Sequence, residues 1–104
     1  MQSDVDSDFD LHELVLLRDE LGGSVWREIS DEAQVVAYYL RCHPRVERVR
    51  YPGIKSDPQY GEAARTLVGG FGPFLRYCVA GEWHTMRCRG GDPKQTILKL
   101  EQAL

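Results

Sequence analysis

The sequence has no long hydrophobic run and no excess of positive charge. Its 104 residues include 13 Lys and Arg against 16 Asp and Glu, which gives a net charge of −3. Proteins that bind nucleic acid through a basic surface usually carry a positive balance. No apolar stretch approaches the roughly 18 residues that a membrane-spanning helix needs. We therefore expect neither a nucleic-acid nor a membrane partner.

Cysteine is scarce, and the first residues lack the pattern of a secretory signal. The three cysteines, Cys42, Cys78 and Cys88, have no Cys-x-x-Cys spacing. An odd number of cysteines without this spacing is typical of free thiols in a reducing compartment. The chain begins with an acidic stretch and not with a basic and then apolar segment. The expected location is the cytoplasm.

The candidate metal ligands are scattered along the chain. They are Cys42, His43, Cys78, His84 and Cys88. Structural zinc sites usually draw their ligands from short, regular spacings, which this set lacks. A hairpin would bring Cys78 and Cys88 close together, but buried free thiols are the commoner outcome. We expect no metal site.

Apolar spacing and capping residues predict four helices. Asp10, Ser30, Asp57 and Asp92 are candidate N-caps, and Pro58 and Pro93 each follow an Asp cap. Apolar residues then recur at helical spacing. The predicted helices cover about residues 11–21, 31–42, 58–67 and 93–104.

Three shorter runs are typical of strands, and they set the predicted fold class. They cover residues 46–51, 74–79 and 83–89, and Gly81 lies in the tight connection between the last two. The order of elements predicts an α+β, two-layer sandwich: a small, mostly antiparallel three-stranded sheet with helices packed on one face. The acidic residues 1–9 are expected to be disordered. Residues 10–104 then form one small domain.

Three motifs between about residues 30 and 80 resemble a known enzyme family. They are Leu40-Arg41-Cys42-His43-Pro44 leading to Tyr51-Pro52-Gly53, then Ser56-Asp57-Pro58-Gln59-Tyr60, and then Gly69-Gly70-Phe71-Gly72. Their order and spacing are similar to the small C-terminal domain of the Cys/Met-metabolism family of pyridoxal-phosphate (PLP) enzymes. That family includes cystathionine gamma-synthase and methionine gamma-lyase. The resemblance implies a truncated relative with the C-terminal fold of fold-type I PLP enzymes.

The resemblance also implies one binding residue. Thr85-Met86-Arg87-Cys88-Arg89-Gly90-Gly91-Asp92 is similar to the last strand of the family, Val-Arg-Leu-Ser-Val-Gly-x-Glu, with Arg89 and Gly90 in place of Ser and Val. The arginine of that strand holds the α-carboxylate of the substrate, because a guanidinium binds a carboxylate through two parallel hydrogen bonds. Arg87 occupies the matching position, so it is the candidate carboxylate-binding residue.

The family's cofactor is PLP, held by a lysine of a large domain. The only lysines of this chain are Lys55, Lys94 and Lys99, and none has the family's Ser-x-Thr-Lys setting. We therefore expect no catalytic residue and no cofactor in the isolated chain. The resemblance favours a stand-alone, catalytically incomplete binding or accessory domain. Two alternatives stay open: a subunit of a split PLP-dependent lyase or transferase completed by a separate large domain, and a relic without activity.

The first predicted helix is apolar on more than one face. Its run Leu14-Val15-Leu16-Leu17 is wider than a one-sided stripe requires. Large exposed apolar patches tend to mark interaction sites. We expect this helix to cover surface of its own domain, or to join a second copy in a homodimer or a separate protein partner.

Overall fold

Three antiparallel strands form one sheet in the computed structural model, which describes residues 8–104. They are β1 (Val46–Arg50), β2 (Phe74–Val79) and β3 (Glu82–Arg87), in the order β1-β2-β3. In the register of β2 with β3, Phe74 lies opposite Arg87 and Val79 opposite Glu82. The predicted α+β class with a small antiparallel sheet is confirmed.

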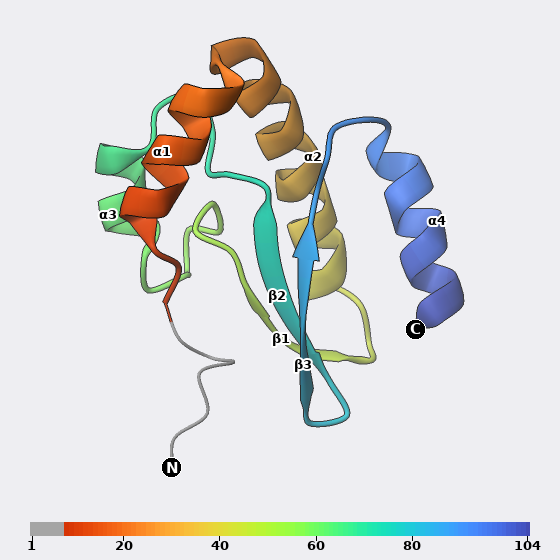
Figure 1. The fold of residues 1–104 in the computed structure, drawn as a ribbon. Helices are drawn as coiled ribbons and strands as arrows, with labels where there is room; N and C mark the ends of the chain where they lie inside the picture. Colours follow the sequence, from red (N-terminus) through yellow and green to blue (C-terminus); the bar gives the residue numbers. More distant parts are fainter. Residues whose placement is uncertain (1–7) are drawn as a thin grey trace.

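One face of the sheet is covered by helices (Figure 1). The long helix α2 (Gly23–Arg41) packs across it, and α4 (Pro93–Ala103) lies beside α2. Apolar residues three and four apart along α2 share one stripe, which is why this helix buries a continuous row against the strands. The buried residues of this core are Ala33, Val36, Ala37, Leu40, Tyr51, Ile54, Leu75, Cys88 and Leu100.

Two further helices, α1 (Leu11–Leu21) and α3 (Tyr60–Thr66), lie together at one end of the sheet (Figure 1). They enclose a second apolar cluster built around the fully buried Trp26. Phe74 of β2 is half-buried against this cluster. The cluster therefore fixes the start of α1 beside the start of β2.

Helix α2 begins at Gly23, although the predicted helix begins at residue 31 with Ser30 as its cap. Trp26 and Ile29 of the added turns are buried in the second cluster. Such tertiary packing usually supplies most of a helix's stability, so it outweighs the local cap signal. Ser30 lies inside the helix, and its Oγ accepts a hydrogen bond from the amide of Gly72 at 3.0 Å.

Asp57 does not cap the third helix, which begins at Tyr60. Its buried carboxylate accepts hydrogen bonds from Arg50 Nε at 3.0 Å and from the amides of Tyr51 at 3.1 Å and Gln59 at 2.9 Å. The side chain thus ties the end of β1 to the loop that follows it.

The other two predicted Asp caps are confirmed. Asp10 accepts a hydrogen bond from the amide of Glu13 at 3.2 Å, and Asp92 accepts one from the amide of Lys94 at 3.0 Å. These bonds satisfy donors that the first turn of a helix leaves open. Helices α1 and α4 start where their caps predict.

The predicted disordered segment falls largely on residues 1–7, which lie outside the described residues. Phe9 is described and buried, and its backbone is held by Gln59: the amide of Phe9 donates to Oε1 at 2.7 Å, and Nε2 donates to the carbonyl of Phe9 at 2.8 Å. The packed domain therefore includes Phe9. Within residues 8–104, no helix is both long and apolar enough to cross a membrane.

The apolar run of α1 points in several directions. Leu14 is buried, and Val15 and Leu17 pack partly against the second cluster. Leu16 is 55% exposed. The helix thus covers its own domain with most of this run and leaves one leucine at the surface.

Candidate functional site

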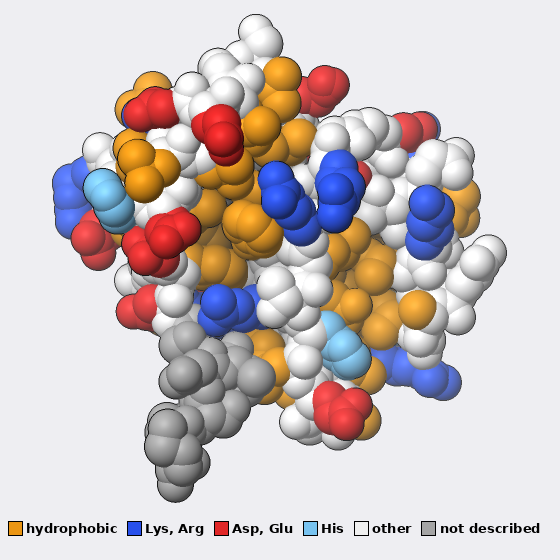
Figure 2. All heavy atoms as spheres, viewed as in Figure 1, with side chains coloured by type: hydrophobic (Ala, Val, Ile, Leu, Met, Phe, Trp, Pro, Cys, Tyr) orange, Lys and Arg blue, Asp and Glu red, His pale blue; other side chains and the backbone are white. Residues whose placement is uncertain are grey.

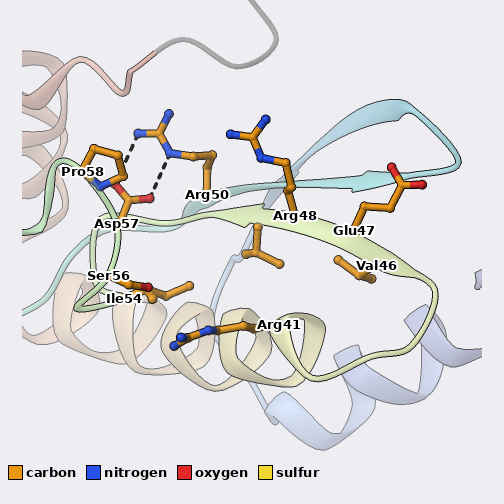
Figure 3. A pocket seen from close by; sticks show the side chains of 10 residues that line it. Arg41, Val46, Glu47, Arg48, Arg50, Ile54, Ser56, Asp57 and Pro58 are labelled. Atoms are coloured by element: carbon orange, nitrogen blue, oxygen red, sulfur yellow. Dashed lines mark hydrogen bonds and ion pairs between the residues drawn. The ribbon is translucent and has the colours of Figure 1, made fainter.

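The sheet face opposite α2 carries an arginine from each strand. Side chains alternate between the two faces of a strand, and Leu75 points into the helix-covered core. Phe74 and Arg76 therefore point to the other face. Figure 3 shows Arg48 and Arg50 on the side of β1 that faces away from α2. We call this surface, with Arg48, Arg50, Arg76 and Arg87, the arginine face.

Each guanidinium of the arginine face lies near an aromatic ring. A cation over a ring is attracted by the ring's negative face, and the contact is worth about 0.5–1 kcal/mol at exposed sites. These contacts hold the arginine side chains along the sheet. The distances to the ring centroids are 5.3 Å for Arg48 over Trp83, 5.7 Å for Arg50 over Phe9, 4.7 Å for Arg76 over Phe9 and 5.4 Å for Arg87 over Phe74.

Arg50 is a structural member of this face. Its guanidinium is buried and forms ion pairs with Asp57 at 3.0 Å and with Asp8 at 3.2 Å. Burial works against the charged form, but the hydrogen bonds and charges of Asp57 and Asp8 outweigh it and hold the pKa of Arg50 above its ordinary value. Arg50 therefore serves the fold and is a poor candidate for a ligand contact.

Arg87, the predicted binding residue, lies at the exposed end of β3. Within residues 8–104 its guanidinium has no ion-pair partner. The loop that follows is anchored by Glu32 of α2, which accepts hydrogen bonds from the amide of Gly90 at 2.9 Å and from Thr96 Oγ1 at 2.6 Å. Glu32 thus fixes the chain just beyond Arg87.

A recess of about 390 Å³ lies between the start of α1 and the arginine face. Figure 2 shows hydrophobic side chains in the hollow beside α1, with Lys or Arg side chains along its border. Arg87 contacts the ring of Phe74, which lines the recess. The recess and Arg87 together form the candidate binding site. The lining residues are Phe9, Asp10, Glu13, Leu14, Phe74, Arg76 and Thr85.

A larger hollow of about 540 Å³ runs along the edge strand β1 (Figure 3). Val46 and Ile54 point toward α2 and form its apolar floor, while Arg41 extends from α2 at its rim. The Arg50–Asp57 ion pair closes one end. The charge of Arg50 is thus already balanced by Asp57, which makes this hollow a weaker anion site than the recess.

Cys78 and Cys88 do not lie opposite each other in the hairpin, as the sequence suggested they would. Cys78 pairs across the strands with Trp83, and its Sγ lies 3.3 Å from Glu47 Oε1. Cys88 packs in the helix-covered core, where burial, and then the charge of Glu32, raise its pKa to about 12. Among the described residues, no three His, Cys, Asp or Glu side chains gather as a metal ion would require.

The sequence analysis named Arg87 but not Arg76, which lines the recess beside it; the binding role of Arg87 stays a prediction. The missed signal is the alternation in two neighbouring strands, where Phe74 and Arg76 share a face with Thr85 and Arg87. The contribution of Phe9 has no signal in the sequence, because it depends on the bonds between Phe9 and Gln59.

Comparisons with known proteins agree with the motifs. The L-methionine gamma-lyase of Pseudomonas deceptionensis is 54% identical over 35 residues, which cover 34% of this chain and 9% of that protein. The L-methionine gamma-lyase of Treponema denticola is 43% identical over 49 residues, 47% of this chain and 12% of that protein. A protein named as a probable cystathionine gamma-synthase of Herpetosiphon aurantiacus is 38% identical over 55 residues, which cover 53% of this chain and 17% of that protein.

These matches span a small part of the relatives, between 9% and 17% of their lengths. The sequence profile described as Cys/Met metabolism PLP-dependent enzyme matches residues 26–88, which is more than half of the chain. The matched range runs from Trp26 in α2 to Cys88, next to Arg87, and includes all three strands of the sheet. This chain therefore belongs to the family of Cys/Met metabolism PLP-dependent enzymes.

Proposed function

We propose that residues 8–104 form a non-catalytic binding domain of this family, which takes the carboxylate of an amino acid at Arg87. The observation that carries the proposal is the position of Arg87 on the arginine face, beside the recess and without an ion-pair partner in residues 8–104. A guanidinium supplies two parallel donors to a carboxylate, and such charge-assisted bonds are about twice as strong as neutral ones.

The residues present do not fit PLP. A lysine that holds this cofactor must stand in a cavity that also receives the ring and the phosphate. Lys55 is exposed in a loop, and Lys94 and Lys99 are exposed on α4. None of the three lines the recess, and Lys99, which lines a separate hollow with Arg87, is exposed to water there. We therefore assign this chain binding and no step of PLP chemistry.

Replacing Arg87 with Ala should abolish binding and leave the fold intact. The residue is exposed and loses one contact with Phe74, so we expect the free energy of unfolding to fall by less than about 1 kcal/mol. The loss of a charge-assisted carboxylate bond should weaken binding about tenfold or more. Amide NMR shifts would be followed while titrating cysteine, homocysteine and cystathionine.

The control for this experiment is Arg27→Ala, which removes an exposed guanidinium from α2. It should change neither stability nor the NMR shifts. The proposal is wrong if no amide near Arg87 shifts at millimolar ligand, or if Arg87→Ala binds as well as the parent chain.

Titration with PLP should give no stoichiometric Schiff base. All three lysines are exposed, so we expect slow, unspecific modification. The measurement is visible absorbance during the titration, followed by variants that each replace one of Lys55, Lys94 and Lys99. A saturable one-to-one band that a single replacement removes would contradict the proposal.

A second candidate function is a part of a PLP-dependent lyase or transferase completed by a separate large domain. The size of the matched relatives favours it, because the aligned residues cover at most 17% of those proteins. A neighbouring reading frame that encodes such a domain would support this candidate. A relic would bind no ligand, so the Arg87 experiment separates it from the binding domain.

The expected homodimer stays a prediction, for which the exposed Leu16 is the best probe.

A further inference from the structure

We infer that the edge strand β3 is an interface for a second copy of this chain, which pairs with it antiparallel, β3 against β3. The pairing joins the three strands of each copy into one continuous sheet around a two-fold axis. The interface does not depend on the ligand proposed for Arg87. It also lies on a different element from the exposed Leu16 of α1.

The backbone of β3 has a neighbouring strand on one side only within residues 8–104. On that side, just beyond the strand, the amide of Cys88 donates to the carbonyl of Pro73 at 2.8 Å. Hydrogen-bonded and non-bonded pairs alternate along antiparallel strands, so every second residue from Cys88 back along β3 also bonds to β2. The backbone groups of the residues between them point outward, away from the sheet. These residues are Trp83, Thr85 and Arg87.

The sequence and geometry of β3 leave its open edge available to another strand. Natural proteins usually blunt such an edge with Lys, Pro or a bulge. Strand β3 contains no Lys and no Pro, and its register with β2 is continuous. His84 lies on the helix side of the sheet and Thr85 on the opposite side, and both are exposed. The described residues therefore cover neither face of the strand at its centre.

The other edge strand, β1, is blunted. Its register with β2 shifts between Val46 and Arg48, as at a bulge. Just beyond the strand, the amide of Tyr51 donates to the carboxylate of Asp57 at 3.1 Å, and Pro52 follows. Of the two edges, β3 is the one that accepts a neighbour. Growth by strand addition therefore stops at two copies.

One register of β3 against β3 uses all the outward residues. A two-fold axis at Thr85 places Thr85 opposite Thr85 of the second copy, and Trp83 opposite Arg87. Each of these pairs exchanges two backbone hydrogen bonds. Thr–Thr pairs and pairs of an aromatic ring with a cation are favourable across strands. With the axis at His84 or Met86 instead, one outward residue would lie opposite no residue of β3.

The two ends of β3 carry opposite charges. Glu82 is exposed at the turn end. Arg87, Arg89 and Lys99 line a hollow of about 330 Å³ at the other end, where the chain leads to α4 (Figure 1). Within residues 8–104 none of these side chains has an ion-pair partner. An antiparallel second copy brings the acidic end of each strand to the basic end of the other, and such complementarity fixes register.

Hydrogen exchange followed by NMR on the full chain tests the pairing residue by residue. The amides of Trp83, Thr85 and Arg87 should exchange about tenfold more slowly once about 90% of the chain is dimeric, because only the monomer exposes them. The amides of His84 and Met86 should be protected at every concentration, since they bond to β2. Sedimentation of the same samples should shift from monomer to dimer as the concentration rises.

Thr85→Pro should abolish the dimer and leave the monomer folded. Proline removes an amide donor that points away from β2, and an edge strand tolerates it there. Leu16→Glu is the control, because it adds a charge at an exposed position of α1. It should leave the sedimentation unchanged.

Opposite charges at position 85 test the register. Thr85→Lys and Thr85→Glu should each weaken self-association about tenfold, because like charges then lie directly opposite each other. A mixture of the two variants should form a dimer at least as tight as that of the parent chain. Such recovery cannot arise from loss of fold, so the test holds even where Thr85→Pro is unstable.

Three results would overturn this interface. The first is a parent chain that stays monomeric up to about 1 mM. The second is a dimer that survives Thr85→Pro or is lost in Leu16→Glu, since its interface then lies elsewhere. The third is a parent dimer without the alternating protection along β3, or a Lys–Glu mixture that stays monomeric. None of these results bears on the carboxylate site proposed at Arg87.

Discussion

Replacing Asp57 with Ala is expected to lower the free energy of unfolding by about 3–5 kcal/mol, because it leaves a buried guanidinium without its main partner. Arg50 and Asp57 are both buried, and the carboxylate also accepts the amides of Tyr51 and Gln59. A domain of this size is typically stable by about 5–15 kcal/mol. The measurement is urea unfolding followed by circular dichroism.

The control is Asp31→Ala, which breaks the exposed pair with Arg27 at 3.6 Å. Both side chains are 69% exposed, so water solvates the partner that remains. We expect a change of no more than about 0.5 kcal/mol. Equal effects at the two positions would show that the buried pair has no special weight in this fold.

Replacing Gly70 with Ala should destabilise the domain by about 2–6 kcal/mol, the sum of backbone strain and forced repacking. Gly70 has a φ of +150°, a value that residues with a Cβ rarely adopt. A Cβ built there would lie 2.4 Å from the Cβ of Ser30, inside the packed helix α2. Neither atom can move without shifting α2 or the loop. Thermal and urea unfolding would both report the loss.

A matched glycine separates the two causes. Gly91 has a φ of +123°, and a Cβ added to it would meet no atom within 4 Å. Gly91→Ala should therefore cost only the backbone strain, about 1–3 kcal/mol. If Gly70→Ala costs no more than Gly91→Ala, the close packing against Ser30 is not important.

The start of a helix was predictable where the capping side chain bonds to an amide of that same helix. Asp10 and Asp92 bond to amides of their own helices, so α1 and α4 begin where the sequence predicts. Ser30 and Asp57 also precede predicted helices as caps do. However, the side chain of Ser30 binds the amide of Gly72, and that of Asp57 binds Arg50. Only the packed structure reveals which of two possible partners such a side chain takes.

The candidate site shows the same division. Arg87 was predicted because a motif of its family surrounds it. Arg76 takes its place at the recess from the register between β2 and β3, and Phe9 takes its place there from Gln59, which lies 50 residues along the chain. Strand register and long-range hydrogen bonds are set by the whole fold, so no local pattern predicts them.

The β2–β3 hairpin has its turn at one end and the candidate binding residue Arg87 at the other. Ala80 and Gly81 both adopt positive φ to make the turn, next to the Val79–Glu82 pair, while Phe74 and Arg87 pair at the other end. The entropy cost of closing a loop rises only slowly with its length. Evolution can therefore lengthen this turn, or insert a whole segment there, without displacing the recess. The hairpin is thus a place where relatives can differ greatly in length while keeping the same face.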